Sequence, residues 1–173
     1  DMDYSLFVKS AAALTPYFEH AVLMGAAGSG LPPLEAEGIA AEAAMFAATE
    51  GVNTHKGAIF LFMTLLCGIG AHFSGGGDPF SAAAALAAEK SAAQSTHGAA
   101  VRAKYAAPGA VGEAAAGFPT AVFAAGLLAK GAPPLRALFE IMARTEDTNV
   151  LFRGGVPALD FVHRSAARAL SAR

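Results

Sequence analysis

The chain has little of several features that mark common functional classes. Cys67 is the only cysteine among 173 residues, so no intramolecular disulfide can form, which is compatible with a cytoplasmic protein. One cysteine and scattered histidines also provide no zinc-ligand spacing. Lys and Arg form no basic cluster and the formal net charge is −2, so the sequence predicts no nucleic-acid partner.

The chain also has no hydrophobic run as long as a typical transmembrane helix. The longest apolar stretch, 58–71, is interrupted by Thr64 and by glycines, and it is shorter than the roughly 18–20 residues that span a bilayer. We therefore interpret it as a buried core helix and expect no membrane partner.

Hydrophobic residues make up 54% of the chain, and much of that fraction is alanine. Alanine favours helices and lets them approach closely, and no stretch alternates with the two-residue period of a strand. We predict an all-α fold, a single-domain helical bundle over 1–173 with the 58–71 helix at its centre. The chain begins without methionine, and we expect it to lack an N-terminal segment.

Caps, prolines and glycines divide the chain into predicted helices. Asp1 or Asp3 can cap the first helix, and Thr15-Pro16 suggests a second one that ends near Met24. The segment from Gly25 to Pro33 is a predicted loop. Further helices are predicted over 34–49, from the central motif to about Phe73, and over 80–105 with a break at Gly98. A short helix is predicted around Glu113, and another one follows it and ends near Lys130. Two more are predicted, one after Pro133-Pro134 and one over the C-terminal segment.

The segment Gly51 to Phe60 concentrates polar chemistry directly before the apolar run. It places Asn53, Thr54, His55 and Lys56 next to one another. A helix start has unpaired backbone N–H groups and the positive end of the helix dipole, which together favour anions. The simpler alternative is a helix capped by Asn53 or Thr54 with a solvated lysine.

A second polar cluster lies near the C-terminus, at Asp147-Thr148-Asn149. If it caps a helix, Asn149 and Arg153 lie four residues apart on one face. Two cations, two amides and backbone donors from the two clusters would suit a polyphosphate. A capped helix with a surface arginine remains the alternative. Glu113, among small residues, is either a solvated helix position or close to a ligand, and His97 lies on an otherwise apolar segment.

Four motifs in order resemble the triphosphoribosyl-dephospho-coenzyme A synthase family, which makes the prosthetic-group precursor of citrate lyase or malonate decarboxylase. They cover almost the whole chain. They are Asp1-Met2-Asp3-Tyr4, Met45 to Thr49 with Val52 to Phe60, Gly112 to Ala115 with Gly117 to Thr120, and Asp147 to Leu151 with Arg153 to Gly155.

The resemblance implies transfer of the 5-triphosphoribosyl group of ATP to the 2′-hydroxyl of 3′-dephospho-CoA, with release of adenine. The product would be destined for an acyl carrier protein, and a homodimer is left open. Carried over motif by motif, phosphate contacts fall to Asn53, Thr54, Lys56, Asn149 and Arg153. Catalytic roles fall to His55, Glu113 and Asp147, with His55 the better candidate acid. Asp3, Glu113 and Asp147 would hold Mg²⁺.

Three positions depart from the pattern expected of the family: Ala40 replaces a glutamate, Val111 an arginine and Ala116 a serine. Two other classes therefore stay open. One is a Mg²⁺-dependent nucleotide or ADP-ribosyl hydrolase on a similar helical scaffold. The other is a non-catalytic nucleotide-binding module. For the enzyme, we predict that the 53–56 and 147–153 clusters converge on one cleft.

Overall fold

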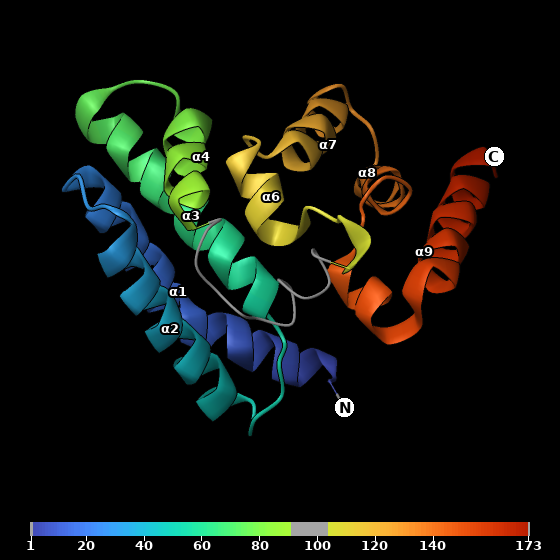
Figure 1. Cartoon of the computed structure of the whole chain (residues 1–173), viewed down its shortest axis with the longest axis horizontal. Helices are drawn as coiled ribbons and strands as arrows, with labels where there is room; N and C mark the ends of the chain where they lie inside the picture. The colour runs from blue at the N-terminus through green and yellow to red at the C-terminus, as the bar shows by residue number, and fades with distance from the viewer. Residues whose placement is uncertain (1, 91–103, 173) are drawn as a thin grey trace. The chain divides into compact units, whose positions relative to one another are not determined.

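A computed structural model describes residues 2–90 and 104–172, and throughout them the regular structure is α-helical. The prediction of an all-α fold is therefore confirmed. Eight helices lie in these two ranges (Figure 1): α1 Tyr4–Ala26, α2 Leu31–Ala48, α3 Lys56–Gly75, α4 Pro79–Lys90, α6 Gly109–Ala115, α7 Pro119–Ala129, α8 Pro134–Met142 and α9 Thr148–Ser171. His97 and the predicted break at Gly98 lie outside the described residues.

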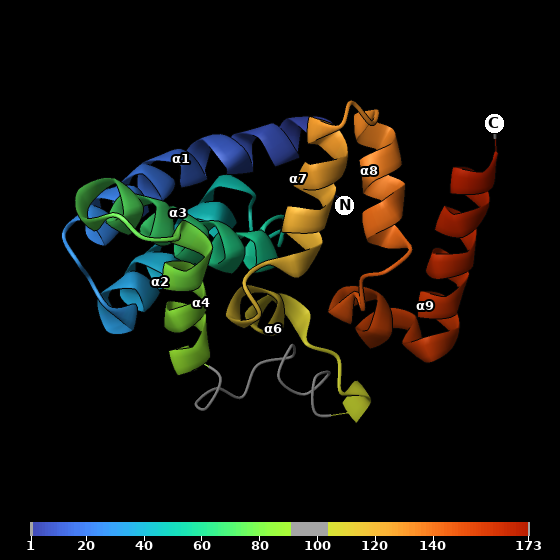
Figure 2. The same ribbon diagram turned by 90° about the horizontal axis from the view of Figure 1, so that it is seen from above.

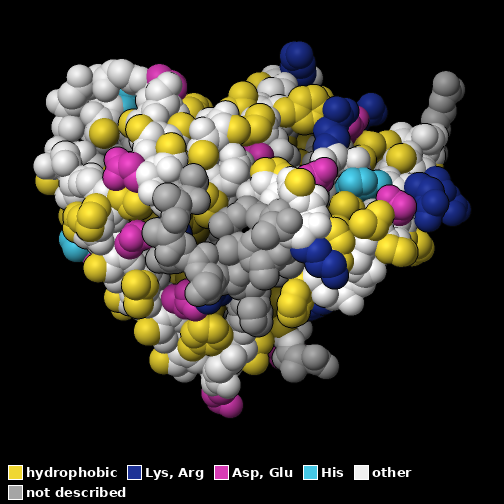
Figure 3. All heavy atoms as spheres, in the orientation of Figure 1, with side chains coloured by type: hydrophobic (Ala, Val, Ile, Leu, Met, Phe, Trp, Pro, Cys, Tyr) yellow, Lys and Arg dark blue, Asp and Glu magenta, His cyan; other side chains and the backbone are white. Residues whose placement is uncertain are grey.

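The chain divides into two compact units. The first comprises 1–92 and 110–117, and the second 93–109 and 118–173. The charged residues are unevenly distributed between the two units. The first unit contains three Lys or Arg and ten Asp or Glu, and the second contains nine Lys or Arg and four Asp or Glu. In Figure 3 most dark-blue side chains accordingly lie over α7 to α9. The single-domain organisation stays a prediction.

The first unit is organised around α3, as the sequence predicted. This helix contacts α1, α2 and α4, and Figure 1 shows it between the α1–α2 pair and α4. Because the buried side chains come from three helices separated in sequence, their packing holds the unit together. That core consists of Leu14, Ala21, Met24, Leu34, Ala41, Met45, Ile59, Met63 and Cys67.

Helix α1 corrects the prediction of a helix start at Thr15-Pro16. It runs through Pro16 without interruption, although Pro16 has no N–H to donate to the carbonyl of Ala12. The hydroxyl of Thr15 donates to the carbonyl of Ala11 at 3.2 Å instead of capping a new helix. Leu14 and Ala21, on either side of the proline, both pack into the core. Tertiary packing therefore outweighs the local break signal.

The predicted loop from Gly25 to Pro33 is also too long. Helix α1 continues to Ala26, and α2 begins at Leu31 with Pro32 and Pro33 in its first turn. Proline is tolerated there because first-turn N–H groups have no partner within the helix. The connection is therefore only four residues, 27–30.

Helix α3 has 20 residues, and it is long and apolar enough to cross a membrane by length and composition. The length of the apolar run, 58–71, therefore underestimates the length of the helix, which extends beyond the run at both ends. Within the described residues, α6 and α7 pass the same test only if they are taken together as one broken span. Core helices pass this test too, and the packing of Ile59, Met63 and Cys67 supports that interpretation.

Glycines let α1 and α3 cross with their backbones in contact. A Cβ added at Gly70 would lie 1.9 Å from the carbonyl oxygen of Val22, and one at Gly25 would lie 1.8 Å from that of Cys67. Neither obstacle is a flexible side chain, so the helices would have to separate. The spacing in sequence gave no sign of this contact.

We expect Gly70→Ala to lower the free energy of unfolding by about 1–3 kcal/mol or more, because overpacking against a backbone cannot relax by a rotamer change. Urea denaturation followed by circular dichroism measures it. The control is Gly38→Ala inside α2, where an added Cβ meets nothing within 4 Å. That change should stabilise the protein by roughly 0.5–1 kcal/mol. Equal stability of the Gly70→Ala variant and its parent would contradict the close crossing.

The second unit contains α7, α8 and α9, which Figure 2 shows side by side. Leu151 and Leu159 of α9 pack with Ala107, which precedes α6. Gly155 has a φ of 64° and bends α9 at this position. On α8, Ala137 is buried, but Leu135 and Leu138 are exposed.

Candidate functional site

The loop between α2 and α3 has a defined shape that presents the central motif. Its start is fixed by the buried hydroxyl of Thr49, which lies 2.8 Å from the carbonyl of Met45 and 2.6 Å from that of Val52. Glu50 and Gly51 then adopt left-handed backbone conformations, with φ of 53° and 87°. Only Gly51 adopts this geometry at no steric cost. The turn brings residues 53–56 to the start of α3.

His55, rather than Asn53 or Thr54, is the N-cap residue of α3. The side chain of Asn53 still contributes a capping bond, because its Oδ1 accepts from the backbone N–H of Lys56 at 3.2 Å. The capping interpretation is thus correct for Asn53. Thr54 directs its hydroxyl elsewhere.

The imidazole of His55 is held by residues from α1. Its Nδ1 lies 2.8 Å from Oγ of Ser10 and 3.0 Å from Oγ1 of Thr54, and these two hydroxyls are 2.6 Å apart. The ring packs on Phe7 with 4.2 Å between centroids. The backbone N–H of His55 donates to Sδ of Met45 at 3.2 Å. The ring is therefore restrained on one nitrogen and one face.

Burial lowers the pKa of His55 below 6.5, because desolvation disfavours the charged imidazolium. The lowered pKa favours the neutral form of the imidazole. A neutral ring is suited to accepting a proton, whereas an acid must first be protonated.

Lys56 forms an ion pair in this structure. Its Nζ lies 2.5 Å from Oε1 of Glu42 on α2. About half of the lysine side chain is exposed, and solvent screens such a pair strongly. Lys56 can therefore exchange the carboxylate for a phosphate, but only by giving up the contact with Glu42.

Asp3 and Asp147 are both helix caps. Oδ1 of Asp3 accepts from the backbone N–H of Leu6 at 2.7 Å, and this hydrogen bond lowers the pKa of Asp3. Oδ1 of Asp147 accepts from the N–H groups of Asn149 and Val150 at 2.7 and 3.1 Å. Capping accounts for both residues locally.

Asn149 and Arg153 lie in the first two turns of α9, before the bend at Gly155. Their spacing of four residues puts them on one helix face, as predicted, and both are exposed. They belong to the second unit, whereas residues 53–56 belong to the first. Convergence of the two clusters stays a prediction.

Glu113 lies on α6 and is half-buried. In the described ranges no three His, Cys, Asp or Glu side chains form a group that could hold a metal ion. The residues predicted to bind Mg²⁺ are divided between the two units, with Asp3 and Glu113 in the first and Asp147 in the second. Magnesium commonly takes one or two carboxylates together with substrate phosphates.

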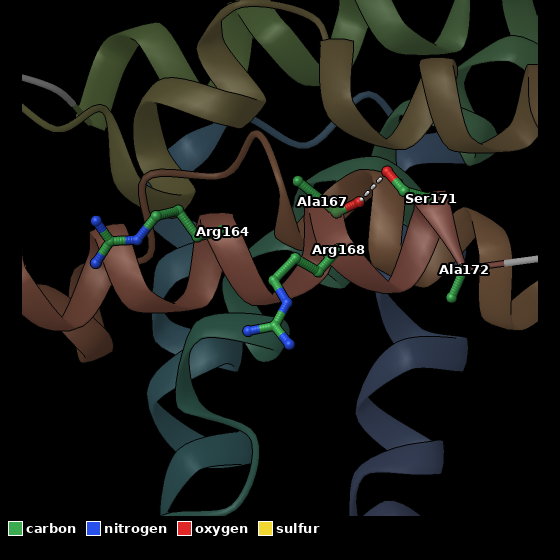
Figure 4. Close-up of a pocket in the computed structure, with 5 residues that line it drawn as sticks. All are labelled: Arg164, Ala167, Arg168, Ser171 and Ala172. Carbon is green, nitrogen blue, oxygen red and sulfur yellow. Dashed lines mark hydrogen bonds between the residues drawn. The ribbon is translucent and has the colours of Figure 1, made fainter.

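A shallow surface hollow lies at the C-terminal end of α9. Arg164, Ala167, Arg168, Ser171 and Ala172 line it, all from the end of α9. In Figure 4 the two guanidinium groups point in different directions, and the Ser171 hydroxyl donates to the carbonyl of Ala167. Residues of a single helix enclose no ligand, so this hollow is not a candidate active site.

Sequence reasoning missed Ser10, Phe7 and Met45 as partners of His55. Ser10 is a fully buried polar residue on the apolar side of α1. A hydroxyl on the buried side of a helix requires a hydrogen-bond partner, so the position of Ser10 among the apolar residues of α1 already indicated that such a partner exists. Its partner could not be named, because His55 follows 45 residues later.

Relatives support one family along the whole chain. The model of the ATP:dephospho-CoA triphosphoribosyl transferase family matches residues 1–173. A probable 2-(5″-triphosphoribosyl)-3′-dephosphocoenzyme-A synthase from Albidiferax ferrireducens is 39% identical over 200 residues, which cover 98% of this chain and 65% of the relative. A synthase of that name from Haemophilus ducreyi is 33% identical over 210 residues, covering 98% and 64%. No solved structure matches.

The chain thus spans just under two thirds of the length of these relatives. Since the alignments extend over 200 and 210 positions, the matched regions of the relatives also contain residues with no counterpart among these 173. A match along every residue nevertheless includes all four motifs found in the sequence. The chain belongs to the ATP:dephospho-CoA triphosphoribosyl transferase family.

Proposed function

We propose that the protein transfers the 5-triphosphoribosyl group of ATP to the 2′-hydroxyl of 3′-dephospho-CoA and releases adenine. The observation that carries this proposal is the family match over the whole chain. In the reaction the bond between C1′ of the ATP ribose and adenine breaks, and a bond from C1′ to the acceptor oxygen forms. The acceptor hydroxyl loses a proton, and the departing base gains one.

His55 is the residue proposed to move a proton. Because burial lowers its pKa, the neutral imidazole is suited to taking the proton of the 2′-hydroxyl as the new bond forms. This assignment replaces the acid role expected from the sequence. The carboxylates of Glu113 and Asp147 are the proposed stabilisers of the positive charge that develops at C1′.

The triphosphate remains on the transferred ribose, so it must be held throughout the reaction. Lys56 and Arg153 are the proposed cationic contacts, with Asn53, Thr54 and Asn149 as neutral donors. The excess of Lys and Arg in the second unit supports an anionic ligand there. Mg²⁺ would neutralise part of the phosphate charge, and Asp3, Glu113 and Asp147 are its proposed ligands together with phosphate oxygens.

The wider setting belongs to the same proposal. The product would be the precursor of the prosthetic group of an acyl carrier protein in the cytoplasm, and a homodimer is left open. The buried thiol of Cys67, whose pKa burial raises, agrees with a reducing compartment.

Adenine release tests the reaction and separates it from a nucleotide or ADP-ribosyl hydrolase. The purified protein is incubated with ATP and Mg²⁺, with or without 3′-dephospho-CoA, and adenine is measured chromatographically. A transferase releases adenine only with the acceptor present, and a product with the combined mass forms. Adenine release without acceptor would indicate hydrolysis. ATP binding without any release would indicate a non-catalytic module.

A further inference from the structure

We propose that Ser10 is a positioning residue for His55. Its hydroxyl accepts the Nδ1 hydrogen of the imidazole and so leaves Nε2 as the nitrogen that takes the substrate proton. This inference rests on the proposed function, because it assigns a partner to the proposed base. It adds a residue from α1, outside the polar motifs, to the site.

The contacts around Nδ1 carry the assignment. Ser10 and Thr54 both lie within hydrogen-bond distance of Nδ1 and of each other. In either tautomer, therefore, Nδ1 is occupied by the hydroxyl pair. Nε2 has no hydrogen bond among the described residues, so it is the nitrogen left to exchange a proton with a ligand.

Hydrogen counting then fixes the arrangement that a base requires. If Nε2 is to accept a proton, Nδ1 must carry the ring hydrogen and donate it. Ser10 can accept that hydrogen at 2.8 Å and donate its own to Thr54 at 2.6 Å. Thr54 is partly exposed and can donate to water. Every buried hydrogen-bonding group in this chain of contacts then has a partner.

Ser10 is also well placed to keep the ring from rotating. It has no exposed surface, so its hydroxyl has no water to replace the ring. A half-turn of the imidazole would place a carbon-bound hydrogen against it. The tilted packing of Phe7 against the ring, with 35° between the two planes, restrains the same rotation. Full burial also excludes Ser10 as a nucleophile, because no substrate atom can reach it.

Nuclear magnetic resonance of the ¹⁵N-labelled imidazoles tests the contact without reference to activity. We expect neutral His55 in the parent protein to carry its hydrogen mainly on Nδ1. Ser10→Ala should move it towards Nε2, while His20, His72 and His163 keep their resonances. A parent His55 protonated mainly on Nε2, or a Ser10→Ala spectrum identical to the parent, would overturn the proposal.

Kinetics test the consequence. Ser10→Ala should lower kcat about tenfold, because a small misplacement of a reacting group is costly, and should leave KM for ATP within about twofold. In the His55→Ala background it should cause no further loss. A loss that adds to that of His55→Ala, or an unchanged kcat, would show that Ser10 does not act through the ring.

The matched control is Thr64→Val. The Thr64 hydroxyl is equally buried but lies near only two carbonyls of its own helix, those of Phe60 and Leu61. Its removal should change neither the His55 resonances nor kcat. If the parent protein shows no transfer at all, the proposed function fails. The tautomer result still decides whether Ser10 holds the ring.

Discussion

Replacing His55 with alanine is expected to lower kcat for the proposed transfer by about 10²- to 10⁴-fold, the usual contribution of a general acid or base. The ring is restrained by Ser10, Thr54 and Phe7, so its proton-accepting nitrogen has a fixed position. Nothing else in the central motif is a neutral base near pH 7. Acceptor-dependent adenine release at saturating ATP and 3′-dephospho-CoA measures the effect.

The control for that substitution is His20→Ala. His20 also lies in the first unit, but its exposed ring pairs with Glu37 at 2.9 Å. Its loss should leave kcat within about twofold of the parent. A His55→Ala enzyme that retains the parental kcat would remove the proton-transfer role from His55.

The pH dependence of kcat/KM should also reflect the role of His55 as a base. Burial lowers the pKa of His55 below 6.5, so the imidazole becomes protonated only as the pH falls below that value. Because a protonated base cannot accept a proton, we expect kcat/KM to stay level above pH 6.5 and to fall below it. A lowered histidine pKa also means that its contribution to stability is present above pH 6.5 and is lost as the pH falls. A level kcat/KM down to pH 5 would contradict the base role.

Lys56→Ala is expected to weaken ATP binding by about ten- to a hundredfold. Charge-assisted hydrogen bonds contribute roughly 1.5–3 kcal/mol. Lys56 is the only cation in the central motif, and the start of α3 beside it supplies only partial charge. The ammonium must leave Glu42 to reach a phosphate, which favours the lower part of that range. Calorimetric titration with ATP and Mg²⁺ gives the affinity.

Two variants sharpen this test. Lys56→Arg should rescue binding only partly, because a planar fork does not replace a compact ammonium at a helix start. Lys130→Ala removes an exposed lysine at the other end of a helix, the C-cap of α7, and should leave ATP affinity unchanged. Thermal unfolding should be nearly the same in all three, since exposed ion pairs contribute little. Parental affinity in Lys56→Ala would show that this motif does not bind the triphosphate.

The caps show what local sequence can specify. Asp3 and Asp147 each bond to N–H groups two or three residues ahead, so the pattern of a few neighbours was enough to predict both helix starts. The same holds for Asn53, whose side chain bonds to the N–H of Lys56 three residues ahead. Local signals were misleading at Pro16. Leu14 and Ala21, on either side of the proline, are buried in a core whose other residues lie far along the chain, and this packing keeps α1 continuous.

The candidate site likewise contains some residues that the sequence indicated and others that only the structure revealed. His55 and Lys56 could be selected from the motif, but their partners could not. Ser10 and Glu42 lie 45 and 14 residues away in sequence, on helices that precede the motif, so no pairing within one helix could have indicated either contact. The lowered pKa of His55 follows from burial, which exists only once α1 and the loop before α3 have packed.

By itself the sequence determined the all-α class, the caps at Asp3 and Asp147, the central position of the 58–71 run and, through its motifs, the family. These properties depend on composition and on interactions within a few residues. Only the tertiary structure decided that α1 continues through Pro16, that Gly25 and Gly70 bring two backbones into contact, and that Ser10 holds His55. Each of these depends on which distant residues share a buried space, and that is settled by packing as the helices come together.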